Sequence, residues 1–445
     1  MRLYGLAWWL LAPLAVLRLL WRSRRDPAYR AFLGERFARY AAPAPRPRPG
    51  GAPLLWLHAV SLGETRAAAP LVEALRRQVP GLRLLLTHTT PTGRAAGAEL
   101  LQPGDAQAWL PYDLPWAVAA FLRHFRPSVG VLMETELWPN LAQACAAQGV
   151  QLLLANARLS ARSAARWARW PALAQATCGA LAGAAAQTGG DASRLRELGV
   201  RDVVVAGNLK FDRRGDAALR ALGREWREAA KRRVLVLAST RADRGVSEEQ
   251  LLLDALPQAL AGRALLVIVP RHQERVPALL QMLEQRGLRH GLRSQGAPDA
   301  DMQVWVGDSI GEMPAYYAMS DAAFIGGSLL PLGGQNLIEA CAESCPVVLG
   351  PHVFNFAQAM DQAEQAGAAL RAGDAREVWE LLLRWLDDEA ALQRARAAAR
   401  EFSASHRGAA QAQAYWIARR LGAWAAGQGP LSTSGSTGRS RATTR

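Results

Sequence analysis

The chain has 445 residues, half of them apolar, and a formal net charge of +15. This length exceeds one ordinary core and fits two domains of about 200 residues each, while the apolar fraction excludes a chain disordered throughout. The four cysteines, Cys145, Cys178, Cys341 and Cys345, form no CxxC pair, which argues against a disulfide framework and a structural zinc site. The positive charge requires an acidic partner, such as nucleic acid, anionic lipid or a phosphorylated small molecule.

Residues 3–21, LYGLAWWLLAPLAVLRLLW, form an apolar run interrupted by Pro13 and Arg18 and followed by three arginines within residues 22–25. No small-residue cleavage site follows, so residues 1–40 are expected to be a retained membrane anchor with a basic juxtamembrane segment. The run can just span a bilayer, but Arg18 and the three tryptophans suit an interfacial helix equally well. The positive-inside rule places the basic end in the cytoplasm. A buried helix packed on the body of the protein is the alternative.

Residues 41–53, AAPAPRPRPGGAP, are a Pro-rich linker, after which short apolar runs alternate with amphipathic helical stretches. This alternation predicts two doubly wound parallel-sheet α/β domains, Rossmann-like and facing a crevice, over residues 54–213 and 214–427, followed by a disordered tail at 428–445. The expected strands of the first domain are LLWLHAV, LRLLLTH, VGVLME, LLLAN, AAAQT and VVVAGN, and those of the second are VLVLAS, LLVIVP, VWVGD, AFIGG and PVVLG.

The segment WLHAVSLGETRAAAP leads from a buried strand through a tight turn into a helix. Ser61 and Glu64 have the S-x-x-E spacing of a capping box, which is a purely structural interpretation of Glu64. The functional alternative is a general base, because Glu64 also lies at the carboxyl end of the first strand, where such sheets place their chemistry.

Two further acids, Glu134 and Glu136, come directly after another strand. Alternate residues of an extended segment point the same way, so both carboxylates could face the crevice. Burying two carboxylates costs several kcal/mol per ion unless they are paired, which favours a use for them, although surface exposure of Glu136 is the alternative.

Lys210 follows the last strand of the first domain in GNLKFD. The chain's 53 basic residues include only two lysines, Lys210 and Lys231, so the retention of a lysine here predicts a specific use. Its compact ammonium group can meet a phosphate or a carboxylate.

In the second half, small and polar loops follow successive strands. Glycines let a phosphate approach the backbone, and an acid one turn into a helix can accept hydrogen bonds from ribose hydroxyls, so these loops predict a nucleotide site. The residues concerned are Pro270 and Arg271, then Gly307 to Glu312, then Gly326, Gly327, Ser328, Gly333 and Gly334 ahead of Asn336 and Glu339.

Several nucleotide and metal motifs are missing. The sequence contains no GxxxxGK[ST] loop, and no GxGxxG follows the first strand, which disfavours a dinucleotide redox enzyme. It also lacks HExxH, GxSxG and DxD, so nothing requires zinc, a serine nucleophile or a sugar-bound magnesium ion.

Seven ordered motifs, HAVSLGE, METELWPN, GNLKFD, PRHQER, GDSIGE, GGSLLPLGGQNLIEA and GPHVFNF, resemble those of the 3-deoxy-D-manno-octulosonic acid (Kdo) transferases of lipopolysaccharide assembly. The match runs in order from about residue 30 to about residue 360. The resemblance implies an inverting glycosyltransferase of GT-B architecture at the cytoplasmic face of the inner membrane. It further implies transfer of Kdo from CMP-Kdo to the lipid A precursor (lipid IVA), with no metal, no other cofactor and no nucleic-acid partner.

Carried onto matching positions, the resemblance implies that Glu64 is the proton acceptor and that Glu134 and Lys210 stabilise the transition state. The positions that correspond to CMP binding are Pro270, Arg271, Ile310, Gly311, Glu312, Asn336, Leu337, Ile338 and Glu339. The chain departs from the expected pattern at Gln335, at Leu337 and Ala340, and in STRADRG at residues 239–245.

Two rival functions fit parts of the sequence. Glycine-rich loops at strand ends do not distinguish CMP from UDP, so a UDP-sugar transferase is the nearest alternative. A membrane-tethered, noncatalytic binder of nucleic acid or anionic lipid would explain the positive charge, but no nucleic-acid-binding module or aromatic-basic repeat is present.

Overall fold

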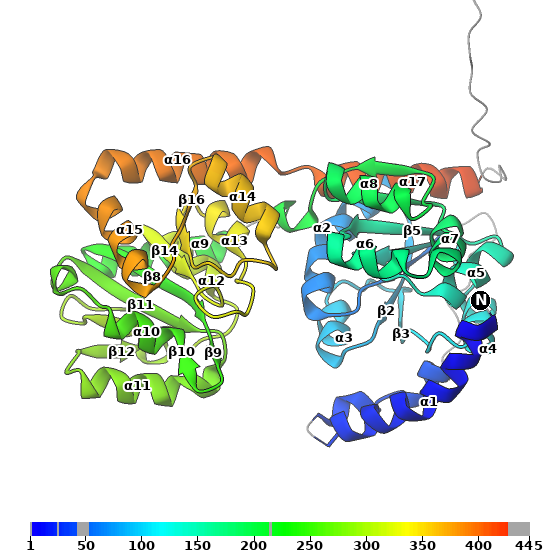
Figure 1. The fold of residues 1–445 in the computed structure, drawn as a ribbon, viewed down its shortest axis with the longest axis horizontal. Coiled ribbons are helices and arrows are strands. Elements are labelled where there is room, and N and C mark those ends of the chain that lie inside the picture. The colour runs from blue at the N-terminus through cyan, green and yellow to red at the C-terminus, as the bar shows by residue number, and fades with distance from the viewer. Residues whose placement is uncertain (1, 25, 42–52, 213–215, 426–445) are drawn as a thin grey trace, which may run out of the picture. The chain divides into compact units, whose positions relative to one another are not determined.

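The computed structural model describes residues 2–24, 26–41, 53–212 and 216–425 (Figure 1). The expected linker at 41–53, the domain boundary at 213–215 and the tail at 428–445 therefore fall wholly or mostly outside the described residues. The chain forms two compact units, Met1–Leu209 with Gly408–Arg445, and Lys210–Arg407.

The first unit contains a seven-stranded sheet whose strands are all parallel to their neighbours. Parallel strands buried on both faces are almost continuously apolar, which is why runs such as LLWLH form β1. In spatial order the strands are β3 (Ala106–Trp109), β2 (Arg83–His88), β1 (Leu54–His58), β4 (Val129–Met133), β5 (Gln151–Ala157), β6 (Gly183–Ala186) and β7 (Val203–Val205).

Alternate residues of β1 pack on opposite faces of this sheet. Leu55 and Leu57 join a core with α2 and α17, whereas Leu54 and Trp56 join a core with α4, α5, α7 and α8. The helices of this unit are α1 (Arg2–Arg22), α2 (Leu62–Gln78), α3 (Pro91–Ala98), α4 (Pro115–Phe125), α5 (Pro139–Ala147), α6 (Ala161–Ala168), α7 (Pro171–Gly179), α8 (Gly189–Glu197) and α17 (Ala409–Ala425), with short 3-10 turns η1 (Pro27–Arg30), η2 (Leu33–Phe37) and, at the boundary, η3 (Leu209–Asp212).

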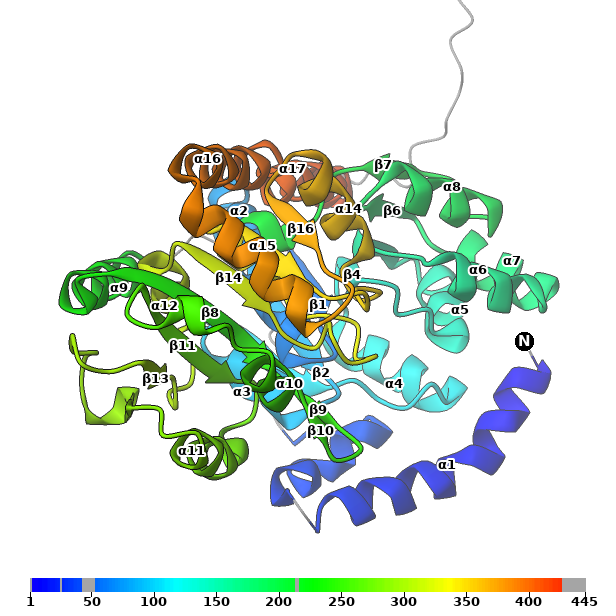
Figure 2. The same ribbon diagram turned by 60° about the vertical axis from the view of Figure 1, so that its left-hand side comes forward.

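The second unit repeats this plan with another seven-stranded parallel sheet (Figure 2). Its strands, in spatial order, are β12 (His290–Leu292), β13 (Val304–Val306), β11 (Ala264–Pro270), β8 (Arg233–Thr240), β14 (Ala322–Ile325), β15 (Val347–Leu349) and β16 (Ala369–Arg371). A small antiparallel hairpin, β9 (Ala242–Asp243) and β10 (Val246–Ser247), follows the carboxyl end of β8.

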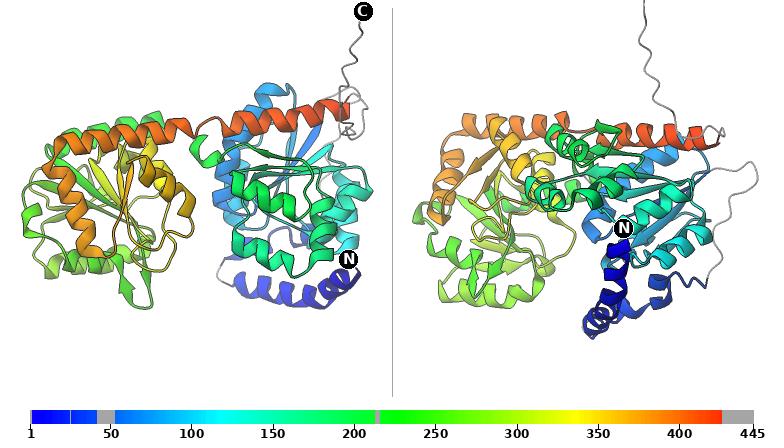
Figure 3. Two further views of the ribbon diagram at one scale, coloured as in Figure 1. Left: turned by 45° about the horizontal axis from the view of Figure 1, so that its top comes forward. Right: turned by 45° about the vertical axis from the view of Figure 1, so that its right-hand side comes forward.

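Helices cover both faces of this second sheet as well (Figures 2 and 3). On one face lie α9 (Ala217–Ala230), α12 (Met313–Met319), α13 (Leu337–Ala342), α14 (Ala357–Gln365) and α16 (Glu389–Ser405). On the other lie α10 (Glu248–Asp254), α11 (Val276–Gln285) and α15 (Ala375–Asp387), with short turns η4 (Gln258–Leu260), η5 (Gln273–Arg275) and η6 (Arg293–Gln295) nearby in sequence. The two expected doubly wound sheets are thus present.

The last helix differs from the expected domain assignment. The strand and helix pattern predicted that residues up to 427 belong to the second domain, but α17 belongs to the first unit. Its apolar side, including Ala414, Ile417 and Leu421, is buried in the same core as α2. Gln413 adds polar contacts, because its Oε1 accepts from the Asn156 N–H at 2.8 Å.

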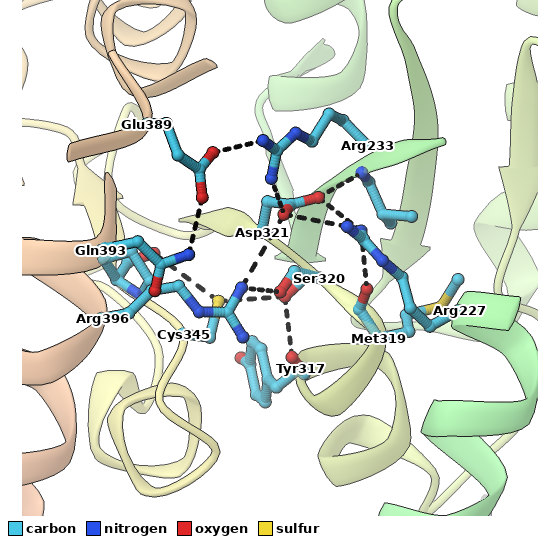
Figure 4. A network of polar contacts seen from close by, with 12 residues as sticks. Arg227, Arg233, Tyr317, Met319, Ser320, Asp321, Cys345, Glu389, Gln393 and Arg396 are labelled. Carbon is cyan, nitrogen blue, oxygen red and sulfur yellow. Dashed lines mark hydrogen bonds and ion pairs between the residues drawn. The ribbon is translucent and has the colours of Figure 1, made fainter. Parts of the chain in front are cut away.

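A buried carboxylate, Asp321, ties helices to the amino-terminal edge of the second sheet (Figure 4). It accepts hydrogen bonds from the Val234 N–H (2.7 Å), from both terminal nitrogens of Arg227 on α9, and from Arg233 (3.0 Å) at the start of β8. Arg396 on α16 lies 3.8 Å away. One side chain therefore neutralises arginines from three elements, and its carboxylate is compensated although it is 1% exposed.

Candidate functional site

Glu64 lies in the first turn of α2, directly after the carboxyl end of β1. Ser61 is the N-cap and its Oγ accepts from the Glu64 N–H at 3.4 Å. The Glu64 carboxylate accepts from the Val60 N–H at 2.8 Å and from the Ser61 hydroxyl at 3.0 Å. The predicted cap is present, with the carboxylate reaching the N–H of residue 60, one position before the N-cap.

The Glu64 carboxylate can also act as a proton acceptor while it caps the helix. Burial, with smaller contributions from the nearby Glu134 and Glu136, raises the pKa of Glu64 to about 7 against the opposing hydrogen bonds from Val60 and Ser61. A carboxyl group with a pKa near neutrality can accept a proton and still be ionised often enough to act at physiological pH. Structural and catalytic roles are therefore compatible in this one residue.

Glu134 and Glu136 follow β4, but not as an extended segment. Residues 134–135 form a turn, and Glu134 has φ +56°, a left-handed conformation that is uncommon for a residue with a side chain. The expectation that alternate residues here point the same way is therefore wrong in its geometry. The Glu134 N–H donates to the Ala155 carbonyl at 2.9 Å, which holds the turn against β5, and such strain is found at functional sites.

The acids nevertheless share one environment. Burial raises the pKa of Glu136, the Trp138 indole N–H (3.0 Å) opposes this rise, and the charge of Glu134 adds to it. Since Glu134 acts on both Glu64 and Glu136, the three carboxylates form one acidic cluster at the carboxyl edge of the first sheet.

Asn156, at the end of β5, holds the segment that leads to Lys210. It is fully buried with φ +53°, and its Oδ1 accepts from the Leu209 N–H at 3.0 Å. Its carbonyl accepts from Gln187 at 2.9 Å. Asn156 thereby fixes the residue that immediately precedes Lys210.

Lys210 begins the second unit, within η3. It is half-buried, and its Nζ lies 5.5 Å from the ring centroid of Phe356. A cation over an aromatic face is held by the ring quadrupole, so Phe356 orients the ammonium group.

The residues predicted to bind the nucleotide differ in their exposure to solvent. Pro270 is buried, whereas Arg271 is exposed and its N–H donates to the Thr240 carbonyl at 2.9 Å. Ile310 is 79% exposed, an unusual environment for isoleucine, and Gly311 has φ +90°. The carboxylate of Glu312 instead pairs with Arg293 at 3.1 Å, so this side chain is held by its own unit.

The amides of the glycine-rich loop after β14 donate to acceptors within the protein. The Glu248 carboxylate, which is fully buried, accepts from the N–H groups of Gly327 (2.6 Å), Ser328 (2.9 Å) and Leu329 (2.9 Å), and of Arg241 (2.9 Å). The Gly326 N–H donates to the Ala238 carbonyl at 2.8 Å. The N–H groups of Gly326, Gly327 and Ser328 therefore all have protein acceptors in this structure, and a role for this loop in phosphate binding stays a prediction.

The remaining two glycines determine the backbone conformation of the loop that precedes α13. Gly333 and Gly334 have φ +88° and +75°, and the Gly334 N–H donates to the Gly327 carbonyl at 2.7 Å. Asn336 caps α13, since its Oδ1 accepts from the Ile338 N–H at 3.1 Å. Leu337 and Ile338 have their side chains in the hydrophobic core, so only their backbones can reach a ligand. Glu339 is partly exposed in the first turn.

Comparison with known proteins assigns this arrangement to a family. A family model described as 3-deoxy-D-manno-octulosonic-acid transferase (kdotransferase) matches residues 32–213. A 3-deoxy-D-manno-octulosonic acid transferase of Bordetella pertussis is 46% identical over 422 residues, which cover 91% of this chain and 96% of the relative. The chain belongs to the Kdo transferase family.

Other comparisons agree with this family. A 3-deoxy-D-manno-octulosonic acid transferase of Haemophilus influenzae is 36% identical, covering 75% of this chain and 78% of its own. A solved glycosyltransferase of Rickettsia africae has a TM-score of 0.58 at 11% identity and covers 83% of this chain and 98% of its own, which shows the fold alone. The resemblance inferred from the motifs is confirmed: this Kdo transferase is a glycosyltransferase with two GT-B-type parallel-sheet domains.

Proposed function

We propose that this Kdo transferase moves Kdo from CMP-Kdo to a hydroxyl group of the lipid A precursor, lipid IVA, in one displacement. The observation that carries the proposal is the Glu64 carboxylate, which combines a position at the carboxyl end of β1 with a pKa of about 7. A general base of this pKa suits an acceptor hydroxyl, whose proton must leave as its oxygen attacks.

In this mechanism Glu64 takes the proton of the acceptor hydroxyl while that oxygen bonds to the anomeric carbon of Kdo. The bond from this carbon to the phosphate oxygen breaks, and its electron pair leaves with CMP. Glu134 contributes in two ways: its charge raises the proton affinity of Glu64, and it stabilises positive charge that develops at the anomeric carbon. Lys210 and Arg271 stabilise the departing phosphate, and no metal ion takes part.

We assign the CMP moiety to the second unit. The exposed Arg271 side chain can meet the phosphate, and the exposed Ile310 side chain, next to Gly311 with its positive φ, can cover a base. Asn336 to Glu339 would contribute backbone groups and the Glu339 carboxylate. Glu248 is a positioning residue in this scheme, because it fixes the loop that precedes α13.

The acceptor is a phosphorylated lipid, so the reaction is proposed at the cytoplasmic face of the inner membrane. Two features support this location. The helix Tyr4–Arg22 is long and apolar enough to enter a membrane, with 11% of it buried. The net charge of +15 favours an anionic lipid surface.

The decrease of kcat/KM at acidic pH should follow the protonation of Glu64. Because its pKa is raised from 4.5 to about 7, Glu64 is protonated below neutrality and cannot accept a proton there. We expect log(kcat/KM) to fall with unit slope as the pH decreases below about 7. Glu136→Gln removes a neighbouring negative charge and should move this decrease to lower pH. A wild-type rate that stays constant down to pH 5 would contradict the assignment.

Lys210 can be tested against the only other lysine of the chain. Loss of one electrostatic contact to a developing charge typically lowers kcat by a factor of about 10²–10³, so we expect the kcat of the Lys210→Ala variant to fall by that factor. Lys210→Arg should recover only part of the rate, because a broad guanidinium group replaces a compact ammonium group. Lys231→Arg, at an exposed position, is the matched control and should retain full activity. Full activity of Lys210→Arg would refute the specific need for lysine.

The stereochemistry of the product tests the single displacement. NMR of the purified glycolipid should show an inverted anomeric centre relative to CMP-Kdo, and CMP should compete with the donor more strongly than UDP does. Retention of configuration would exclude one displacement with Glu64 as base. Stronger competition by UDP would instead favour a UDP-sugar donor.

A further inference from the structure

Helix α1 exposes most of its apolar side chains. Tyr4, Gly5, Trp8, Leu19 and the following Ser23 are at least partly covered. A helix of this length and composition can either cross a membrane or lie along its surface. The strongly exposed apolar side chains are Leu6, Trp9, Leu10, Leu11, Leu14, Leu17 and Trp21, with exposed fractions between 51% and 74%.

The amino-terminal end of α1 is attached to the interior of the first unit. The Tyr4 hydroxyl donates to Asp113 Oδ2 at 3.0 Å, and the Trp8 indole N–H donates to the Tyr4 oxygen at 2.7 Å. Asp113 is 1% exposed and also accepts from the N–H groups of Asn140 (3.0 Å) and Leu141 (2.8 Å) at the start of α5. This contact therefore reaches a structural carboxylate, not a mobile surface group.

Aromatic packing strengthens the same attachment. The Trp8 ring lies 6.2 Å from that of Tyr112 and 6.5 Å from that of Trp138. Gly5 is buried, and a Cβ built on it would lie 3.6 Å from Pro115 Cγ on α4. Trp138 in turn donates to Glu136, so the start of α1 packs against the segment that carries the acidic cluster.

The carboxyl-terminal end of α1 is attached to the same unit. Ser23 is 3% exposed and its Oγ accepts from Arg30 Nε at 2.7 Å. The next residue, Ala31, accepts from the indole N–H of Trp109, on β3, at 2.7 Å. The helix is thus fixed directly to the unit at its amino-terminal end and, through η1 and Ala31, at its carboxyl-terminal end, and it runs along the outer side of this unit (Figures 1 and 3).

These attachments distinguish between the two membrane arrangements. A helix of 21 residues is about 31 Å long, close to the thickness of about 30 Å of the hydrocarbon core. If α1 crossed the bilayer with Arg22 at one interface, Tyr4 would lie at the opposite interface. Asp113 and the start of α5 could not accompany it there, because they are part of the folded α/β unit, whose loops and strand ends cannot lie across the hydrocarbon core.

We propose that α1 lies in the plane of the membrane interface, attached at both ends to its own domain, with its exposed leucines and tryptophans in the lipid. Tryptophan at the polar–apolar boundary and exposed arginines such as Arg18 and Arg22 are typical of interfacial helices, which enter about 5–10 Å into the bilayer. This arrangement depends on the proposed membrane location of the enzyme. It places the acidic cluster on the same unit that contacts the lipid.

A cysteine cross-link tests the attachment in the membrane-bound enzyme. All four native cysteines are buried, so the pair Gly5→Cys with Pro115→Cys can be oxidised with copper phenanthroline against a low background. The full-length protein is first floated with vesicles of phosphatidylethanolamine and phosphatidylglycerol. We expect an intramolecular disulfide in the floated fraction, and none in the control pair Leu10→Cys with Pro115→Cys, because Leu10 is 74% exposed.

Other results would overturn the arrangement. No disulfide in floated protein, with position 5 labelled by an impermeant maleimide only from the side opposite the domains, would show that α1 crosses the bilayer. Failure to float would exclude the membrane contact itself. Disulfide formation and maleimide labelling require neither CMP-Kdo nor the lipid acceptor. Their outcome is therefore independent of the proposed catalytic function, which product analysis tests separately.

Discussion

Glu64→Gln should remove most of the transferase activity and leave the fold intact. A glutamine can still accept a hydrogen bond from the Val60 N–H, because Glu and Gln serve equally in a capping box. It cannot accept the acceptor's proton, so we expect kcat to fall by about 10²–10⁴, the usual contribution of a general base. CMP affinity measured by titration calorimetry and the melting temperature should stay close to wild type.

The cap needs its own control. Ser61→Ala removes the hydroxyl that accepts from the Glu64 N–H and donates to its carboxylate, at a cost of about 1 kcal/mol of stability. It leaves the carboxylate in place, so most of the activity should remain, with the acid limb of the pH profile at higher pH because one stabilising donor to the anion is lost. If Glu64→Gln were active and Ser61→Ala were not, Glu64 would be a structural residue and the base would lie elsewhere.

Of the substitutions proposed here, Asp321→Asn should lower the free energy of unfolding most. The amide keeps the shape of the side chain but leaves Arg227 and Arg233 without the negative charge that holds α9 and β8 together (Figure 4). Breaking a buried ion pair typically costs about 3–5 kcal/mol, and we expect about 2–3 because both arginines are about one-third exposed. For a unit of this size the melting temperature should fall by about 5–10 °C in a calorimetric scan.

The exposed neighbour Glu389 provides the matched control. It pairs with the same Arg233 from α16, but its side chain is 53% exposed. Surface ion pairs contribute little, so Glu389→Gln should leave the melting temperature unchanged within error. Activity at low temperature should survive in both variants, since Asp321 precedes β14 at the edge of the sheet opposite its Gly326 to Ser328 loop. Equal effects of the two substitutions would contradict the importance of burial.

The sheets were predictable because they are parallel and buried on both faces. Runs such as LLLTH and VLVLAS contain enough consecutive apolar residues to be strands on composition alone. The strands that the sequence analysis missed are short or partly exposed at the edges, such as AQAW in β3, the three-residue β12 and β16, and the hairpin β9–β10. Their identity depends on a neighbouring strand, not on their own pattern.

The placement of α17 shows a different limit. Its sequence is helical and rich in alanine and arginine, which predicts the helix and not its partner. The partner is set by contacts such as Gln413 with Asn156, which are 257 residues apart in the chain. Local periodicity carries no information about pairing at that separation.

In the candidate site, too, features set by local sequence were predictable, and features set by distant contacts were not. The spacing of Ser61 and Glu64 predicted both the cap and the strand-end position correctly, because both are local. The acceptors of the glycine-loop amides could not be predicted, because Glu248, which accepts from three of these N–H groups, lies about 80 residues earlier in the chain. The turn at Glu134 was likewise invisible, since a left-handed glutamate has no sequence signal.

The most direct test of the proposed reaction is CMP release by the detergent-solubilised wild-type enzyme, with CMP-Kdo as donor, in the presence and absence of lipid IVA. We predict release that requires the lipid and equals the amount of Kdo found on it by mass spectrometry. Release at the same rate without the lipid, or lipid that gains no Kdo, would contradict transfer to this acceptor and would leave Glu64 with its capping role alone.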